Sequence, residues 1–275
     1  MVNWLRLPKK VYFKRGSTPV ALRELSEVYG MKRAFLISDS NDFNKGITRP
    51  IEALLKAQGI RYASFSSFDS EFTYDDAYNA LAKMESLKPD VIIGIGSVSA
   101  MSMARLMAML LDNPETDLEA EAAKHSAITE VVSDCPGSTD KLVLVPSINY
   151  AATLPVVSAI GKDGKRTAML DFAALPFMAV IDPETDDQLT ADELKKNASD
   201  ILALAEKVKA DPETSEYVIG FAEDAVRIVN DNLPLIENGD ESARRAIENL
   251  ANAAAIAGAA AANAGIDSQD ILKLY

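Results

Sequence analysis

The chain has 275 residues, of which 48% are hydrophobic, and its formal net charge is −13. That is enough apolar material for a buried core, in one large domain or two smaller ones. A surface this acidic repels nucleic-acid phosphates and anionic lipid headgroups, so neither is expected as a partner. The single cysteine, Cys135, excludes an internal disulfide, and the first residues contain no apolar signal core. We therefore expect a cytoplasmic protein.

Short β-rich runs alternate with helical runs through the first half of the chain. The predicted order is strand 9–16, helix 20–29, strand 33–39, helix 47–58, strand 62–68, helix 74–87, strand 90–96, helix 99–111 and strand 141–147. The runs 33–39, 90–96 and 141–147 are continuous and apolar, as expected for strands covered by helices on both faces. This alternation predicts a parallel α/β sheet with right-handed crossovers.

The pattern changes in the second half of the chain. Residues 156–170 predict a hairpin with its turn at 162–164, and residues 178–183 predict one more strand. Three helical runs follow, at 190–210, 212–237 and 240–264. We therefore place a boundary near residue 185, with an α/β domain over residues 1–185 and an all-helical domain over residues 186–275.

The strand at 90–96 leads into a glycine-containing turn and then a helix. Gly94, Gly96, Ser97 and Ser99 stand at this turn, where a helix N-terminus offers backbone N–H groups and a positive dipole end to a phosphate. The turn matches neither the GxGxxG fingerprint nor a P-loop, because the later glycines and the lysine are missing. Two interpretations stay open: a nucleotide site, or an ordinary strand-to-helix turn in which Gly and Ser are common.

A carboxylate ends the second predicted strand. Asp39 closes the run RAFLISD, and ligands of open α/β sheets bind outside the carboxyl ends of the strands. There it can accept hydrogen bonds from ribose hydroxyls. On position alone, it is explained equally well as the N-cap of the segment that follows.

Six stretches of the sequence resemble the iron-containing (group III) alcohol dehydrogenases, most closely the alcohol dehydrogenase half of bifunctional aldehyde-alcohol dehydrogenases. In family order they are WLRLPKKVYFKRGS, LKPDVIIGIGSVSAMSMARLM, DNPETD, VLVPSIN, VIDPE and NAAAIAGAAAANAGI. The resemblance implies a dehydroquinate synthase-like architecture, in which an α/β nucleotide-binding domain precedes a helical domain and the active cleft lies between them. It also implies NAD as the dinucleotide.

Both cofactor loops depart from the family pattern. The family's phosphate loop resembles GGGSPMDAAK, whereas residues 96–105 are GSVSAMSMAR, so Val98 adds a branched side chain where a pyrophosphate should approach the backbone. The second loop resembles PTTSGTGSE in the family and is PSINYAATL at residues 146–154, where Tyr150 is expected to fill the nicotinamide space. Asp39 matches the family's aspartate at the adenosine ribose. The candidate cofactor contacts are Asp39, Gly94, Gly96, Ser97, Ser99, Ser147 and Asn149.

The metal site departs further. The family binds Fe(II) or Zn(II) with one aspartate and three histidines, whereas this chain has one histidine, His125, which we expect at the surface or at a helix end. An alignment without gaps from the preceding strand places Asp200 at the family's metal-binding aspartate and Leu204 at its first histidine. An alignment counted back from the downstream helix places Ser199 and Ala203 at those two positions. The fourth ligand is expected in helices that follow in the family. Neither iron nor zinc is therefore expected, and Asp200 is at most a vestigial ligand.

Alcohol oxidation by hydride transfer needs a metal or a positioned base to take the hydroxyl proton. The Tyr-xxx-Lys pair of metal-free dehydrogenases is absent, and we assign no catalytic residue. The sequence therefore predicts a degenerate family member that keeps the fold and a role in nucleotide binding or subunit assembly. The expected partner is a second copy or a related dehydrogenase, because family members pair through their N-terminal strand. Two alternatives stay open: a NAD-dependent alcohol or aldehyde oxidoreductase with a weakened or rebuilt site, and the product of a decaying gene.

Overall fold

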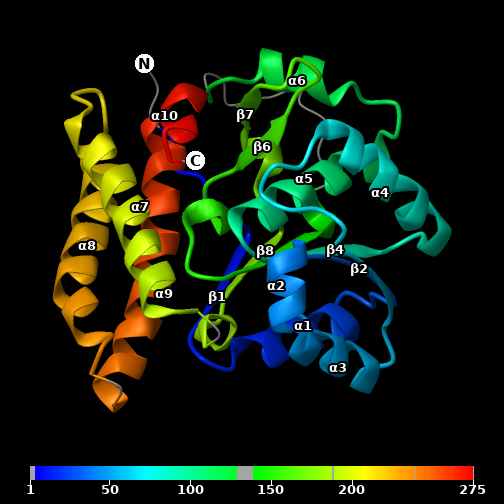
Figure 1. The fold of residues 1–275 in the computed structure, drawn as a ribbon, viewed down its shortest axis with the longest axis horizontal. Helices are drawn as coiled ribbons and strands as arrows, with labels where there is room; N and C mark the ends of the chain where they lie inside the picture. The colour runs from blue at the N-terminus through cyan, green and yellow to red at the C-terminus, as the bar shows by residue number, and fades with distance from the viewer. Residues whose placement is uncertain (1–3, 129–138, 188, 239, 275) are drawn as a thin grey trace.

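The computed structural model describes residues 4–128, 139–187, 189–238 and 240–274, so Cys135 lies outside the described part. Figure 1 shows three regions: a central sheet with helices around it, a hairpin above the sheet, and three long helices packed along one side. This arrangement confirms the predicted α/β part followed by a helical part.

Six parallel strands form the sheet, in the order β1-β8-β5-β4-β2-β3. They are β1 (Lys10–Phe13), β2 (Arg33–Ile37), β3 (Arg61–Phe65), β4 (Val91–Gly96), β5 (Leu142–Pro146) and β8 (Met178–Ile181). Every residue of β4, β5 and β8 is buried, as their continuous apolar sequences predict. The parallel ladder confirms the fold class expected from the alternating pattern.

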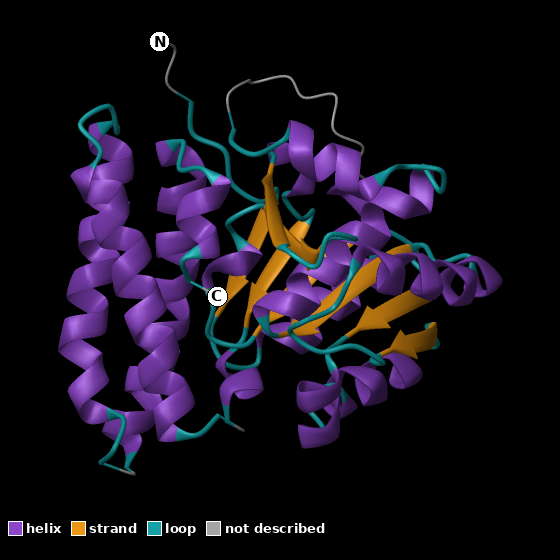
Figure 2. Ribbon diagram, turned by 45° about the horizontal axis from the view of Figure 1, so that its top comes forward, coloured by secondary structure: helices purple, strands orange, loops and turns teal. Residues whose placement is uncertain are grey.

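Helices cover both faces of this sheet (Figure 2). They are α1 (Ser17–Glu27), α2 (Ser40–Lys45), α3 (Arg49–Ala57), α4 (Tyr74–Leu87), α5 (Val98–Asp112) and α6 (Leu118–Lys124). Apolar side chains of α1 and α3 pack on one face, where Leu22, Leu25 and Leu55 are buried against Ile93 and Val143. Helices α4 and α5 pack on the other face. The sequence pattern does not predict the short helices α2 and α6, because neither is long enough to show an apolar period.

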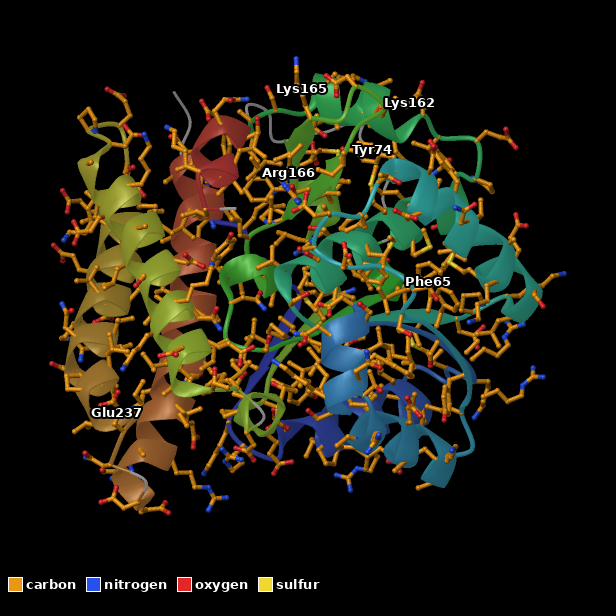
Figure 3. The ribbon with its side chains drawn as sticks, viewed as in Figure 1. Phe65, Tyr74, Lys162, Lys165, Arg166 and Glu237 are labelled. Carbon is orange, nitrogen blue, oxygen red and sulfur yellow. The ribbon has the colours of Figure 1, made fainter. Side chains whose placement is uncertain are left out.

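The predicted hairpin forms a separate two-stranded antiparallel sheet of β6 (Val156–Ile160) and β7 (Arg166–Leu170). Gly164 adopts φ 76° in its turn, which only glycine does without strain. Lys162 and Lys165 project outward from this end of the molecule, and the hydroxyl of Tyr74 on α4 lies 2.8 Å from that of Thr167 on β7 (Figure 3). The hairpin is thus held against α4.

The helical part consists of α7 (Ala191–Ala210), α8 (Glu216–Asn232) and α9 (Glu241–Ala264), followed by α10 (Ser268–Leu272), which the sequence pattern does not predict. Short 3-10 turns lie at Thr139–Lys141, Tyr150–Ala152, Phe172–Ala174, Pro183–Asp186 and Leu233–Leu235. The boundary near residue 185 falls between β8 and α7, and the division into two domains stays a prediction. None of the described helices is long and apolar enough to cross a membrane.

Helix α9 packs closely on its neighbours because one stretch of it is made of small residues. Alanines from Ala246 to Ala262 are buried among α7, α8 and the segment before the hairpin. The hydroxyl of Thr153 donates to the carbonyl of Ala255 at 2.6 Å. A single apolar cluster therefore runs from the sheet into the helical part.

Candidate ligand cleft between the sheet and the helices

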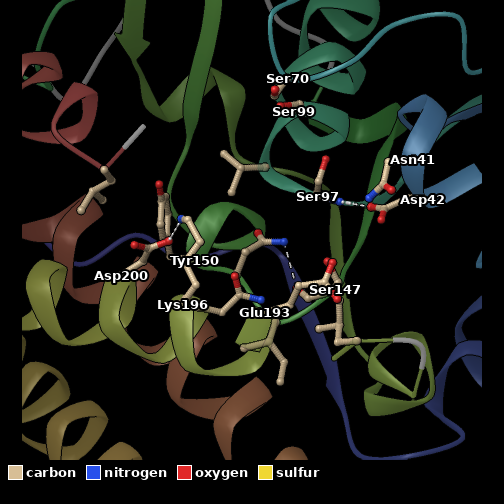
Figure 4. A pocket seen from close by; sticks show the side chains of 16 residues that line it. Asn41, Asp42, Ser70, Ser97, Ser99, Ser147, Tyr150, Glu193, Lys196 and Asp200 are labelled. Atoms are coloured by element: carbon tan, nitrogen blue, oxygen red, sulfur yellow. Dashed lines mark hydrogen bonds and ion pairs between the residues drawn. The ribbon is translucent and has the colours of Figure 1, made fainter. Parts of the chain in front are cut away.

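A cavity of about 370 Å³ lies between the carboxyl ends of β4 and β5 and helix α7 (Figure 4). The sheet side contributes Asp42, Ser97, Ser99, Ser147, Asn149 and Tyr150. Helix α7 contributes Glu193, Lys196 and Asp200. Its size is within the range of small-molecule sites, and its position is where ligands of parallel sheets bind.

The start of α5 forms one wall of this cleft. Ser97 is the N-cap of α5, and its hydroxyl oxygen accepts a hydrogen bond from the Ala100 N–H at 3.2 Å. The Ser97 backbone N–H donates to Oδ2 of Asp42 at 2.9 Å. Gly96 adopts φ 106°, and a Cβ there would overlap the Asp42 carboxylate and the Ile47 side chain. A carboxylate of the chain itself therefore lies on the loop that the sequence predicts as the phosphate loop.

Asp39 lies behind the cleft rather than in its lining. It is the N-cap of α2, accepting a hydrogen bond from the Asp42 N–H at 2.9 Å, and its other oxygen accepts one from the Ser97 hydroxyl. The side chain is buried, with 6% of the residue exposed. The N-cap interpretation of Asp39 is thus what the structure shows, and a ribose contact stays a prediction.

Burial is the main influence on the charge of Asp42. Loss of hydration, together with the neighbouring Asp39 carboxylate, raises the pKa of the Asp42 carboxyl to about 7, although the Ser97 N–H and Lys45 act in the opposite direction. Lys45 donates to Glu193 on α7 at 2.6 Å, and this bond lowers the pKa of Glu193. The ion pair also links α2 to α7 across the cleft.

The second loop is joined to the first by hydrogen bonds to one carbonyl. The Ser147 N–H and the Asn149 side-chain amide each donate to the Gly96 oxygen at 2.9 Å. The Ile148 N–H donates to the buried carboxyl of Asp186 at 2.7 Å, and complete burial raises the pKa of Asp186 well above its usual value. The turn around Ser147 is therefore fixed from two sides.

The structure brings the seven candidate cofactor contacts to one edge of the sheet, but only some of them line the cleft. Ser97, Ser99, Ser147 and Asn149 line the cleft. Asp39, Gly94 and Gly96 do not, and a Cβ at Gly94 would overlap Ala104 on α5 and Leu144 on β5. Gly94 thus permits close packing of α5 on the sheet, and whether any of the seven contacts a cofactor stays a prediction.

Arg105 supports the second loop, a role that sequence reasoning misses. The residue is 1% exposed, and its guanidinium donates to the carbonyls of Ala174 at 2.8 Å, Ala151 at 2.5 Å and Leu154 at 3.1 Å. The sequence feature that could have predicted this role is an arginine inside the otherwise uncharged helical run SVSAMSMARLMAMLL. Arg105 holds the segment that places Tyr150, which is buried and forms part of the cleft wall.

Asp200 lines the opposite wall with a lysine as its partner. Lys196 lies one turn earlier on α7, and its Nζ is 2.7 Å from Oδ2 of Asp200. Leu204, one turn later, is 3% exposed and packs in the core. Sequence reasoning assigns no role to Lys196, although the i,i+4 spacing of the two charges on a predicted helix is a usable signal.

The only histidine of the chain lies elsewhere. His125 is the C-cap of α6, as the expected helix-end position requires, but it is buried rather than at the surface. Its Nδ1 is 3.1 Å from the carboxylate of Asp171, and its Nε2 is 3.1 Å from that of Glu121. Among the described residues no three His, Cys, Asp or Glu side chains form a group that could hold a metal. The donors around Asp200 therefore do not fit the iron or zinc ion that the resemblance implies.

A family model for iron-containing alcohol dehydrogenases matches residues 8–183. The chain is 30% identical over 266 residues to the bifunctional aldehyde-alcohol dehydrogenase AdhE of Escherichia coli K12, an alignment of 95% of this chain and 30% of that protein. It is 26% identical over 270 residues to the 1-propanol dehydrogenase PduQ of Salmonella typhimurium, covering 96% of this chain and 65% of PduQ. The chain thus spans about 30% of the length of AdhE.

Solved structures agree with the fold. A 1,3-propanediol oxidoreductase superposes with a TM-score of 0.83 at 19% identity, covering 96% of this chain and 67% of that one. Sulfoacetaldehyde reductase from Bifidobacterium kashiwanohense, in complex with NAD+, superposes with a TM-score of 0.79 at 16% identity, covering 94% and 67%.

Proposed function

The chain belongs to the iron-containing alcohol dehydrogenase family, and on that premise we propose that its cleft does not carry out metal-dependent alcohol oxidation. It is a degenerate member in which the family fold serves ligand binding or subunit assembly. The observation that carries this proposal is the set of side chains around Asp200: one turn later stands the buried Leu204, which has no ligand atom, and the polar partner at 2.7 Å is Lys196.

The chemistry at this wall supports the proposal. A metal lowers the pKa of a bound hydroxyl by direct coordination, which a lysine ammonium cannot reproduce. The ammonium of Lys196 already balances the charge of Asp200. Leu204 offers no ligand atom, and His125 is absent from the residues that line the cleft. We therefore expect no metal-assisted removal of a hydroxyl proton at this wall.

One observation favours the alternative, a NAD-dependent oxidoreductase with a rebuilt site. The hydroxyls of Ser99 and Ser147 line one cavity at the carboxyl edge of the sheet, beside Ser97 and Asn149, whose side chains bond to Asp39 and Gly96. Such groups bind polar ligands, including ribose hydroxyls. This function requires turnover without added metal, so the same assay separates the two proposals.

The assay is NAD+ reduction with 1-propanol, the substrate that the name of PduQ indicates. The purified chain is incubated anaerobically with Fe(II), with Zn(II) or with EDTA, and desalted. We expect no NADH formation above the rate without protein in all three samples, and no retained metal. AdhE of E. coli, treated in the same way, is the positive control. Metal-dependent turnover would contradict the proposal, and turnover in EDTA would favour the rebuilt oxidoreductase.

We also propose that two copies pair through β1. This strand is at one edge of the sheet and exposes Val11 and Phe13, the latter at 65%. An open edge with apolar side chains is normally covered by a partner.

Light scattering after gel filtration should therefore give a dimer, and Phe13→Glu should give a monomer. Tyr217→Glu is the matched control, because Tyr217 is an aromatic residue 81% exposed on α8, and this variant should stay dimeric. A wild-type monomer at tens of micromolar would contradict the pairing.

A further inference from the structure

We infer that Asp42 excludes phosphate-bearing ligands from the cleft, because its carboxylate lies where a ligand phosphate would meet the start of α5. The inference rests on the proposed function in taking this cleft as the ligand site. It adds a specificity that neither the family resemblance nor the fold provides.

The geometry leaves no room for a second anion at this amide. Oδ2 of Asp42 accepts the Ser97 N–H at 2.9 Å, so that N–H cannot also donate to a phosphate with good geometry. The space above Gly96 is filled by the same carboxylate, which a Cβ at Gly96 would overlap. Asp42 is also part of the cleft lining, so a ligand that enters the cleft meets it directly.

Helix α2 holds the carboxylate in this position. The Asp42 backbone N–H donates to the Asp39 side chain at 2.9 Å, and the other Asp39 oxygen accepts from the Ser97 hydroxyl. Asp39 thereby links the start of α2 to the start of α5. These bonds fix the backbone of Asp42, and its carboxylate is held by the Ser97 N–H and by burial, with 6% of the residue exposed.

The surrounding charges also oppose a phosphate. Asp39 lies beside Asp42, and the cation on α2, Lys45, is paired with Glu193 at 2.6 Å. Near the loop there are thus three carboxylates, of Asp39, Asp42 and Glu193, and one ammonium, of Lys45. A ligand phosphate here would add negative charge to a partly buried site that already carries an excess of it.

Calorimetric titration with ADP at pH 8 tests the inference, because ADP carries a diphosphate and Asp42 is ionised at this pH. We expect no measurable binding to the wild type, and a gain in affinity of about tenfold or more in Asp42→Ala, since removing a like charge beside a phosphate is worth more than 1.4 kcal/mol. Asp42→Asn, which keeps the shape and removes the charge, should gain less.

Two controls separate charge from space. Asn41→Ala enlarges the same wall and keeps the Asp42 carboxylate, and Val98→Ala widens the approach to the loop. Neither should bind ADP. Thermal melts check that Asp42→Ala folds, which we expect because burial raises the pKa of Asp42, so its ionised form is disfavoured in the folded chain.

The inference is overturned if folded Asp42→Ala binds ADP no better than the wild type, or if the wild type binds it tightly. Neither result affects the proposal that the Asp200 side of the cleft holds no metal, which the turnover assay tests by itself. Turnover of NAD+ by the wild type would overturn the inference as well as the proposed function, because NAD+ carries a diphosphate, whereas tight ADP binding to the wild type without turnover would overturn this inference alone.

Discussion

Replacing Gly258 with alanine should lower the free energy of unfolding by about 3 kcal/mol, the cost of forcing a methyl group into a closely packed backbone contact. A Cβ at Gly258 would overlap the backbone oxygen of Tyr150 and the hydroxyl of Thr153, and would lie 3.1 Å from the Leu154 nitrogen. To make room, α9 must move away from the segment that forms the cleft wall. The hydrogen bond from Thr153 to Ala255 would then lengthen or break.

Gly220→Ala is the matched control. Gly220 lies inside α8, and nothing lies within 4 Å of a Cβ built there. Alanine should stabilise this helix by about 1 kcal/mol, because glycine is the poorer helix former. Urea unfolding of both variants measures the difference. A loss below about 1 kcal/mol in Gly258→Ala would contradict the close contact of α9 with the cleft wall.

Arg105→Met should destabilise the protein by about 3 kcal/mol, because it removes a buried donor group from three backbone carbonyls. Methionine keeps most of the apolar stem, so the loss reports the guanidinium bonds to Ala151, Leu154 and Ala174. The fluorescence of Trp4, the only tryptophan, follows the unfolding, since its ring lies edge-on to that of Phe172 at 6.3 Å.

Arg105→Lys is the control for charge. Lysine keeps the positive charge but donates from one nitrogen, and it cannot reach three carbonyls in this arrangement. We expect a loss between those of the wild type and Arg105→Met. A lysine variant as stable as the wild type would show that charge matters more than the three bonds. A methionine variant within about 1 kcal/mol of the wild type would contradict the supporting role of Arg105.

The sheet could be predicted because its central strands are buried on both faces. Such strands appear as continuous apolar runs, and the hairpin has a glycine turn between two β-rich runs. Helix α2 could not be predicted in this way. It has six residues and is defined by its Asp39 cap, so it shows no apolar period.

The cleft could be predicted only in part. Ser97, Ser99, Ser147 and Asn149 follow strands, and the carboxyl ends of parallel strands meet at one edge. The contact of Asp42 with Ser97 joins residues 55 apart and requires that β2 and β4 be neighbours in the sheet. The role of Arg105 likewise depends on carbonyls up to 69 residues away. Local sequence patterns carry no information on such contacts.

Calorimetric titration of Zn(II) into the purified 275-residue chain, with and without NADH, tests the central claim most directly. If Lys196 takes the place of a metal at Asp200, no binding tighter than millimolar should occur in either case, and NADH should not change it. One-to-one micromolar Zn(II) binding that weakens in Asp200→Ala, or tightens with NADH, would contradict the account and restore a metal-dependent dehydrogenase site in this cleft.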